Sequence, residues 1–268
     1  MKNIGILITT YNEESRILDV IESARLISND ILILDNNSTD RTVDLANSVK
    51  NVNVINHDIP LTDYANRIEL GIKSLIQSNA DLQFIGHLNC SERFNIKFAK
   101  HLLSLDLSGF SAIAVYRTAR TDSFPTHPYH ILYFLRHLFK KHKTYRFVAV
   151  DQWDRSLCRI HAEWQPSDRK KVYSIPFWKV VIDYDRIGDI DIVELKHMEY
   201  AKTESLSKAY SSRLSIILRL FLRPLFYFTY NLPYLIFSYS DKRLISVVQH
   251  CYYMASVYIR MLQNKNSK

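Results

Sequence analysis

Two stretches near the start of the chain decide the fold: Ile4-Gly-Ile-Leu-Ile-Thr-Thr-Tyr-Asn-Glu13 and Ile31-Leu-Ile-Leu-Asp-Asn-Asn-Ser-Thr-Asp-Arg-Thr42. Each begins with an apolar run of strand length and continues into a polar loop rich in turn and helix-capping residues. Apolar residues at helical spacing follow each loop, over residues 14–27 and 40–49. The two stretches therefore predict two successive strand–loop–helix units.

The same alternation continues along the chain and predicts an α/β fold. Alternating strands and helices with short connections favour a mostly parallel sheet that is flanked by helices. Right-handed crossovers then bring the loops after the strands to one edge, where open α/β sheets bind ligands. The expected strands are 4–9, 31–34, 52–55, 84–88 and 111–116, and the further helices are 63–77 and 94–104.

The composition excludes several classes of protein. With 268 residues and 47% hydrophobic content, the chain is long and apolar enough to bury a core. Five Gly and seven Pro exclude a collagen-like or low-complexity chain, and three Cys without ligand spacing argue against a disulfide scaffold or a zinc ribbon. The first apolar run is too short for a signal peptide or a membrane span, so we expect a cytoplasmic protein.

The positive charge is concentrated in the last quarter of the chain. The formal net charge is +8, and residues 201–268 hold ten Lys or Arg against two acids, whereas residues 1–200 hold 25 of each sign. The same quarter is rich in Phe and Tyr, which a solvated basic tail would not be. We therefore expect a catalytic or binding domain over 1–200 and a basic, aromatic helical extension over 201–268.

The extension resembles a membrane-surface element more than a membrane span. Its apolar stretch from Leu214 to Phe237 contains Arg219 and Arg223, and we expect Pro224 and Pro233 to break the helix. Helices with basic and apolar faces bind anionic lipid surfaces, which predicts peripheral attachment to the inner face of the cytoplasmic membrane. The alternative is a helical subdomain that packs on the sheet or on another subunit of a homo-oligomer. Nucleic-acid binding is not expected, because no reader motif is present.

The two loops resemble those of the family 2 glycosyltransferases of GT-A fold. In that family the first strand ends in Thr-x-Tyr-Asn-Glu and the second in Asp-x-Gly-Ser-x-Asp-x-Thr, and the likeness covers the first hundred residues. Residues 195–206 and the tail are most similar to bacterial lipopolysaccharide-core and capsule transferases. The resemblance implies inverting transfer of a sugar from a nucleotide-sugar donor to a lipid-linked acceptor of a bacterial surface glycan.

The ends of the first two strands form the expected donor pocket. The carboxylate of Asp35 can accept hydrogen bonds from a nucleobase, while the loop with Thr9 and Tyr11 can supply a backbone contact and an aromatic wall. Asn37 replaces the Gly of the family and is expected to adopt left-handed backbone angles. Ser38 and Thr39 are candidate N-caps of the next helix. The resemblance implies that Thr9, Tyr11, Glu13, Asp35 and Asp40 line or brace this pocket.

The fourth strand departs from the family pattern. The family has Asp-x-Asp there to hold Mg²⁺ or Mn²⁺ against the donor diphosphate, but this chain has Asn89-Cys90-Ser91-Glu92. Asn89 and Ser91 are kept as candidate donor contacts, and Glu92 is the candidate metal ligand. Three alternatives stay open: a cation is bound through Glu92 and waters, basic side chains neutralise the leaving phosphate, or the chain is a catalytically silent scaffold subunit of a glycan-assembly complex.

The remaining candidates lie outside these loops. An inverting transfer needs a general base, and the segment 151–163 offers Glu163 first and Asp151 next, with Asp154 and His161 as further candidates. By resemblance, His197 and Lys202 are phosphate partners, although a strand-end His and a Lys in a first helical turn explain them equally well. Arg67 resembles the Arg of the family's third helix and completes the candidate donor contacts.

Overall fold

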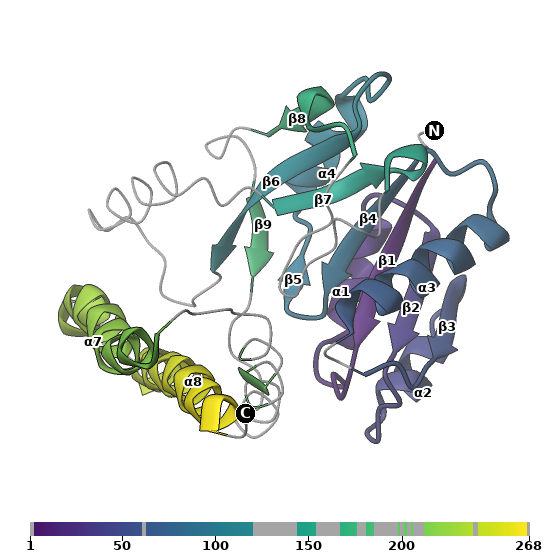
Figure 1. Cartoon of the computed structure of the whole chain (residues 1–268). Helices are drawn as coiled ribbons and strands as arrows, with labels where there is room; N and C mark the ends of the chain where they lie inside the picture. Colours follow the sequence, from purple (N-terminus) through teal and green to yellow (C-terminus); the bar gives the residue numbers. More distant parts are fainter. Residues whose placement is uncertain are drawn as a thin grey trace. The chain divides into compact units, whose positions relative to one another are not determined.

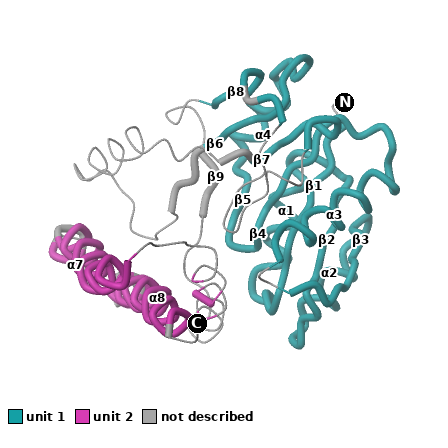
Figure 2. Tube along the Cα trace, viewed as in Figure 1, with its two compact units in different colours: residues 1–185 teal, residues 186–268 magenta. Residues whose placement is uncertain are grey.

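The computed structural model forms two compact units, residues 1–185 and residues 186–268 (Figure 2). The structure describes residues 3–60, 63–119, 144–153, 167–175, 181–184, 198, 201–202, 205, 212–237 and 241–266.

The first unit is built on a mixed sheet with strand order β3-β2-β1-β4-β7-β6-β9-β5, and β8 pairs with β6 (Figure 1). The first four strands are parallel to one another, whereas β7 is antiparallel to both β4 and β6. The strands are β1 (Ile4–Thr10), β2 (Asp30–Asp35), β3 (Val52–Asn56), β4 (Phe84–Asn89), β5 (Glu92–Arg93), β6 (Ala112–Ala119), β7 (Thr144–Ala149), β8 (Val172–Ser174) and β9 (Val181–Tyr184).

Alternating residues of the central strands pack into two separate cores, because successive strand side chains point to opposite faces. Ile6 and Ile8 of β1 belong to the core that includes α1 and α4, whereas Leu7 belongs to the core that includes α3. Helices therefore cover both faces of the sheet, as the sequence predicted. They are α1 (Ile17–Arg25), α2 (Thr42–Asn47), α3 (Tyr64–Ser78) and α4 (Ile96–Ser104), with the short 3-10 helices η1 (Val150–Gln152) and η3 (Arg169–Lys171).

The second unit contains two long helices, α7 (Arg213–Phe237) and α8 (Asp241–Asn266), that pack against each other. Ile216 of α7 joins Val257, Tyr258 and Met261 of α8 in a small apolar core. α7 continues through Pro224 and Pro233, so the expectation that prolines end this helix was wrong. A proline removes one backbone hydrogen bond, and packing along the neighbouring helix can hold the two halves of such a helix together.

The structure confirms the α/β fold with a helical C-terminal part, and it adds details that the sequence pattern missed. The antiparallel strand β7 has no counterpart among the expected strands, and α2 begins at Thr42 instead of residue 40. Among the described residues, no helix is both long enough and apolar enough to cross a membrane. The division of the chain after residue 200 stays a prediction.

Candidate functional site

The carboxyl ends of β1, β2 and β4 bring the predicted donor residues together. In the strand register Thr9 lies opposite Asn89, and Thr10 lies opposite Asp35. The Thr9 hydroxyl donates a hydrogen bond to Asn89 Oδ1 at 3.2 Å. Thr9 and Asn89 are both partly exposed, whereas Asp35 is fully buried. The predicted edge therefore exists, with Asp35 beneath its surface.

Asp35 organises the loop that follows β2. Its Oδ1 accepts hydrogen bonds from the hydroxyls of Thr10 and Ser38, both at 2.6 Å, and its Oδ2 accepts from the Ser38 backbone N–H at 2.7 Å. Three donors on one carboxylate fix the turn. Asp35 thus braces the loop through internal hydrogen bonds, and its expected contact to a nucleobase stays a prediction.

The loops after β1 and β2 are bound to each other as one rigid platform. Asn12 is the centre of these contacts: its N–H donates to Ser38 Oγ and its Oδ1 accepts from the Thr39 N–H, each at 2.8 Å. Both Asn12 and Asn37 have positive φ angles, 52° and 56°, which confirms the left-handed conformation expected at Asn37. Ser38 and Thr39 are thus engaged within the loops, and the expectation that they cap α2 was wrong.

Asp40 supplies the hydrogen bonds at the start of α2. Its Oδ1 accepts from the Thr42 N–H at 2.9 Å and from the Thr42 hydroxyl, and its Oδ2 accepts from the Glu14 N–H at 3.1 Å. Burial raises the pKa of Asp40, but these hydrogen bonds outweigh it and lower the pKa below 3.8. Glu13 is buried and forms an ion pair with Arg16 at 2.7 Å. Both carboxylates therefore brace the platform, in line with the role that the sequence assigned to them.

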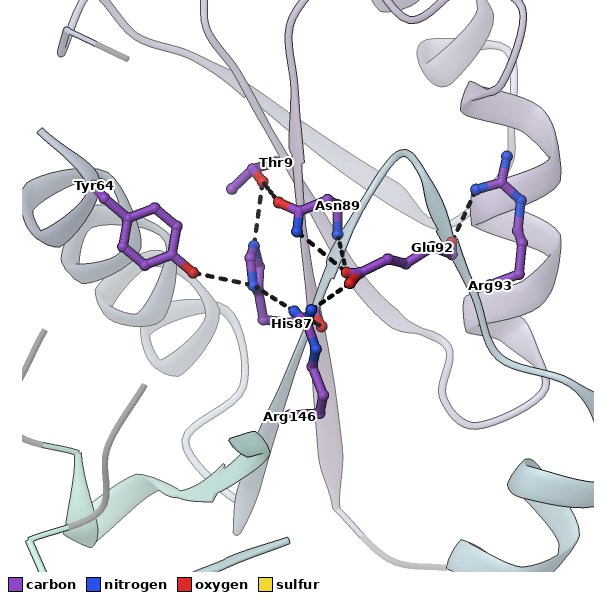
Figure 3. Close-up of polar contacts among 7 residues, drawn as sticks. All are labelled: Thr9, Tyr64, His87, Asn89, Glu92, Arg93 and Arg146. Atoms are coloured by element: carbon purple, nitrogen blue, oxygen red, sulfur yellow. Dashed lines mark hydrogen bonds and ion pairs between the residues drawn. The ribbon is translucent and has the colours of Figure 1, made fainter. Parts of the chain in front are cut away.

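A polar network lies between β1, β4 and β7 next to this platform (Figure 3). His87 is fully buried in β4; its Nε2 lies 3.2 Å from Thr9 Oγ1, and its Nδ1 lies 3.4 Å from the Tyr64 hydroxyl of α3. Arg146 of β7 lies on the other side, with Nη1 3.5 Å from both His87 Nδ1 and the His87 carbonyl oxygen. The network connects the first turn of α3 to the antiparallel strand.

Glu92 is fully buried and forms an ion pair with Arg146, which is 4% exposed. Its other oxygen, Oε2, accepts from the backbone N–H of Asn89 at 3.0 Å and from Asn89 Nδ2 at 3.2 Å. A divalent ion of the Mg²⁺ or Mn²⁺ type needs several oxygen ligands, and both oxygens of this carboxylate already have partners. No cluster of three or more His, Cys, Asp or Glu that could hold a metal occurs in the described part of the chain. These residues therefore do not fit a divalent cation.

The other predicted residues lie in different places. Tyr11 is partly exposed in the first loop, Ser91 lies in the turn between β4 and β5, and Arg67 is buried in α3. Lys202 is exposed and belongs to the second unit. Glu163 and His197, with the further base candidates Asp154 and His161, lie outside the described residues.

Asp151 lies at the wrong end of the sheet for a general base. Because β7 is antiparallel to β4, Ala149 pairs with Phe84 at the start of β4, and the Val150 N–H donates to the Gln83 carbonyl. Asn89 lies at the opposite end of β4. At roughly 3.3 Å per residue, the length of β4 separates Asp151 from the donor edge. The assignment of Asp151 as a catalytic base was wrong, because the direction of β7 was not visible in the sequence.

Four residues of the edge were missed by the sequence analysis: Tyr64, His87, Arg146 and Asn36. The first three lack a local motif and meet only in the folded structure, His87 and Arg146 on strands and Tyr64 on α3. Asn36 directly follows Asp35, and its side-chain oxygen is buried without a hydrogen-bond partner in the described part of the structure. An unsatisfied buried acceptor beside the platform is a candidate for a ligand contact. The position of Asn36 within the stretch 31–42, directly after Asp35, is the signal that could have identified it.

His57 gives the edge a predicted dependence on pH. Burial, and then the positive charge of Arg67, lower the pKa of His57 below 6.5, although Asp35 and Asp58 oppose this shift. His57 Nδ1 accepts a hydrogen bond from the Ile59 N–H at 3.1 Å, which requires an unprotonated Nδ1. His57 binds a proton more weakly in the folded protein than in the unfolded chain. The folded state is therefore most stable above pH 6.5, and it loses stability as the pH falls from 6.5 toward the lower pKa of His57 in the folded protein.

We therefore expect the melting temperature to fall between pH 7.5 and pH 5.5, and to fall less in the His57→Asn variant. Asparagine keeps a hydrogen-bond acceptor near Ile59 but does not titrate. Thermal unfolding followed by circular dichroism across this pH range measures the difference. Parallel pH curves for the two proteins would show that His57 does not contribute.

Residues 5–74, from β1 through most of α3, match the sequence model of the family described as Glycosyl transferase family 2. This segment contains both loops of the platform, which confirms the resemblance inferred from them. No curated protein sequence gives a significant match to the chain.

Solved structures with a similar fold were also found. The TarS 1-349 structure of S. aureus in complex with UDP-GlcNAc is 12% identical in sequence and has a TM-score of 0.46. The match covers 100% of this chain and 92% of the TarS chain. The mannosyltransferase PcManGT of Pyrobaculum calidifontis with GDP-Man and Mn²⁺ is 9% identical, with coverages of 99% and 75% and a TM-score of 0.47. Glucosyl-3-phosphoglycerate synthase of Mycobacterium tuberculosis is 14% identical, with coverages of 75% and 78% and a TM-score of 0.44.

Proposed function

We propose that the protein is an inverting glycosyltransferase that moves a sugar from a nucleotide-sugar donor to a bacterial surface glycan of the lipopolysaccharide or capsule type. The observation that carries this proposal is the juxtaposition of Thr9, Asp35 and Asn89 at one edge of the sheet, within and beside the family 2 segment. The braced loops provide a rigid support on which a nucleotide can bind without ordering costs. Asn36, whose side-chain oxygen is buried without a partner in the described part of the structure, and the partly exposed Tyr11 are the proposed contacts of the nucleobase.

A general base completes the proposed reaction. It removes the proton of the acceptor hydroxyl while that oxygen attacks the anomeric carbon and the nucleoside diphosphate leaves. Glu163 is the proposed base, and His197 and Lys202 are proposed contacts of the phosphates. A transfer assay with a panel of nucleotide-sugars and lipid-linked glycan acceptors tests this proposal. We expect release of nucleoside diphosphate that depends on acceptor and is lost in Glu163→Gln; failure of every donor to react would favour the silent scaffold instead.

The second unit supports a proposal for where the reaction occurs. The surface of α7 exposes large apolar side chains next to Arg213 and Arg223, which are also exposed. Apolar burial and basic charge together bind helices to anionic bilayers. We infer that this surface attaches the protein to the inner face of the cytoplasmic membrane, where a lipid-linked acceptor is available. Its members are Leu214, Leu218, Phe221, Leu222, Leu225, Phe226 and Ile236, which are 50–68% exposed.

We predict that the Phe221→Ser/Phe226→Ser variant loses at least about tenfold of its affinity for anionic vesicles, because each buried aromatic side chain contributes about 1.5–3 kcal/mol. Flotation with phosphatidylglycerol-containing liposomes measures the bound fraction. Ile96→Ser removes an exposed apolar side chain from α4 in the first unit and is the matched control. Wild-type protein that stays at the bottom of the gradient, or that forms a dimer through this surface, would contradict membrane attachment.

A further inference from the structure

We propose that the buried ion pair of Arg146 with Glu92 takes the place of a divalent cation at the donor edge, so that a nucleotide-sugar is bound without Mg²⁺ or Mn²⁺. This inference rests on the proposed glycosyltransferase function and names the pair that positions the residues of its donor site. It excludes one of the alternatives left open by the sequence, in which a cation is bound through Glu92 and waters.

The first argument is the charge balance of the edge. The Asp-x-Asp motif of the resembled family is here Asn89 and Ser91, which removes two anionic groups. The remaining carboxylate, Glu92, is fully buried and has one guanidinium as its counter-ion. A buried charge needs such a partner, and one carboxylate is balanced by one arginine. A divalent ion bound by Glu92 would have to displace this arginine from the carboxylate.

The second argument is that Arg146 has donor capacity beyond Glu92. A guanidinium carries five N–H donors. Nη2 bonds to Glu92, and the contacts of Nη1 to His87 are long, at 3.5 Å. Arg146 Nε is buried and has no hydrogen-bond partner in the part of the chain that the structure describes. The Nε–H can therefore donate to a further acceptor while Nη2 stays bonded to Glu92.

The third argument is the connection of Arg146 to the exposed residues of the edge. Glu92 Oε2 holds Asn89 through two hydrogen bonds, and Asn89 Oδ1 accepts from Thr9. Arg146 thus fixes the edge through Glu92. It is a positioning residue in this scheme, because the chain of contacts to the ligand passes through Asn89 and Thr9.

Calorimetric titration with UDP and GDP, once in EDTA and once in excess Mn²⁺, tests the proposal. We expect the affinity of the wild-type protein for its nucleotide to change less than about twofold between the two buffers. A gain of about tenfold or more in Mn²⁺ would overturn the inference while leaving the proposed function intact. No binding of either nucleotide in both buffers would instead count against the proposed function.

Direct titration of Mn²⁺, followed by electron paramagnetic resonance, gives a readout that needs no nucleotide. We expect no saturable Mn²⁺ site in the wild-type protein. The Asn89→Asp/Arg146→Met variant should gain one Mn²⁺ site, because it has carboxylates at positions 89 and 92 and lacks the guanidinium that binds Glu92. Saturable binding to the wild-type protein at this edge, abolished by Glu92→Gln, would overturn the proposal. If the double variant does not fold, Arg146→Lys replaces it: nucleotide binding in EDTA should persist, and a new requirement for Mn²⁺ would contradict the inference.

Discussion

The Arg146→Met variant is expected to lose about 3–5 kcal/mol of its free energy of unfolding, because it removes the arginine that forms an ion pair with the fully buried Glu92 carboxylate. The Asn89 hydrogen bonds to Oε2 remain, but they are too few to replace a charged partner. Equilibrium unfolding in urea, followed by circular dichroism, measures the change.

Two further variants separate the effect of charge from the effect of side-chain truncation. Glu92→Gln/Arg146→Met removes both charges and should recover most of the loss, since replacing a whole buried pair is often nearly neutral. Arg41→Met breaks the exposed ion pair with Glu14, 3.5 Å long, and should cost only about 0–1 kcal/mol. A single-variant loss below about 1 kcal/mol, or a double variant no more stable than Arg146→Met, would contradict a buried pair.

The Asp35→Ala variant is expected to lose about 3 kcal/mol of stability and at least about tenfold in nucleotide affinity. Hydrogen bonds to a charged group contribute about 1.5–3 kcal/mol each, and the substitution leaves the Thr10 hydroxyl and the Ser38 N–H unpaired. The second loop then loses its anchor, and with it the geometry of the platform.

Asp44→Ala is the matched control for this prediction, because Asp44 is exposed on α2, the helix that follows the same loop. Urea unfolding and calorimetric titration are measured on both variants. An Asp35→Ala protein with the stability and nucleotide affinity of the Asp44→Ala protein would show that the platform does not depend on the buried carboxylate.

The parts of the fold that were predictable from the sequence are those with local signals. The apolar runs before Thr9 and Asp35 give two strands, and parallel neighbours must end at the same edge. Asn37 was also predictable, because few other residue types tolerate a positive φ. The two loops identify both the family and the site because their function and their structure depend on the same short segments.

The other half of the site depends on long-range pairing and could not be predicted. Arg146 meets Glu92 only because β7 runs antiparallel to β4, and no local pattern in the sequence gives that direction. The same strand direction places Asp151 at the far end of the sheet, which is why a candidate chosen from its residue type was wrong. His87 is a similar case: a histidine inside an apolar strand has no local signal that separates packing from function.

The most direct test of the account is whether the edge formed by Thr9, Asp35 and Asn89 binds an activated sugar. Calorimetric titration of the wild-type protein with UDP, GDP and dTDP and their common sugar conjugates, in chelator and in manganese buffer, measures this directly. The account predicts saturable binding of one nucleotide class, weakened in Asp35→Ala and unchanged in Asp44→Ala. Absence of binding for every nucleotide in both buffers, by a protein that unfolds cooperatively, would contradict it.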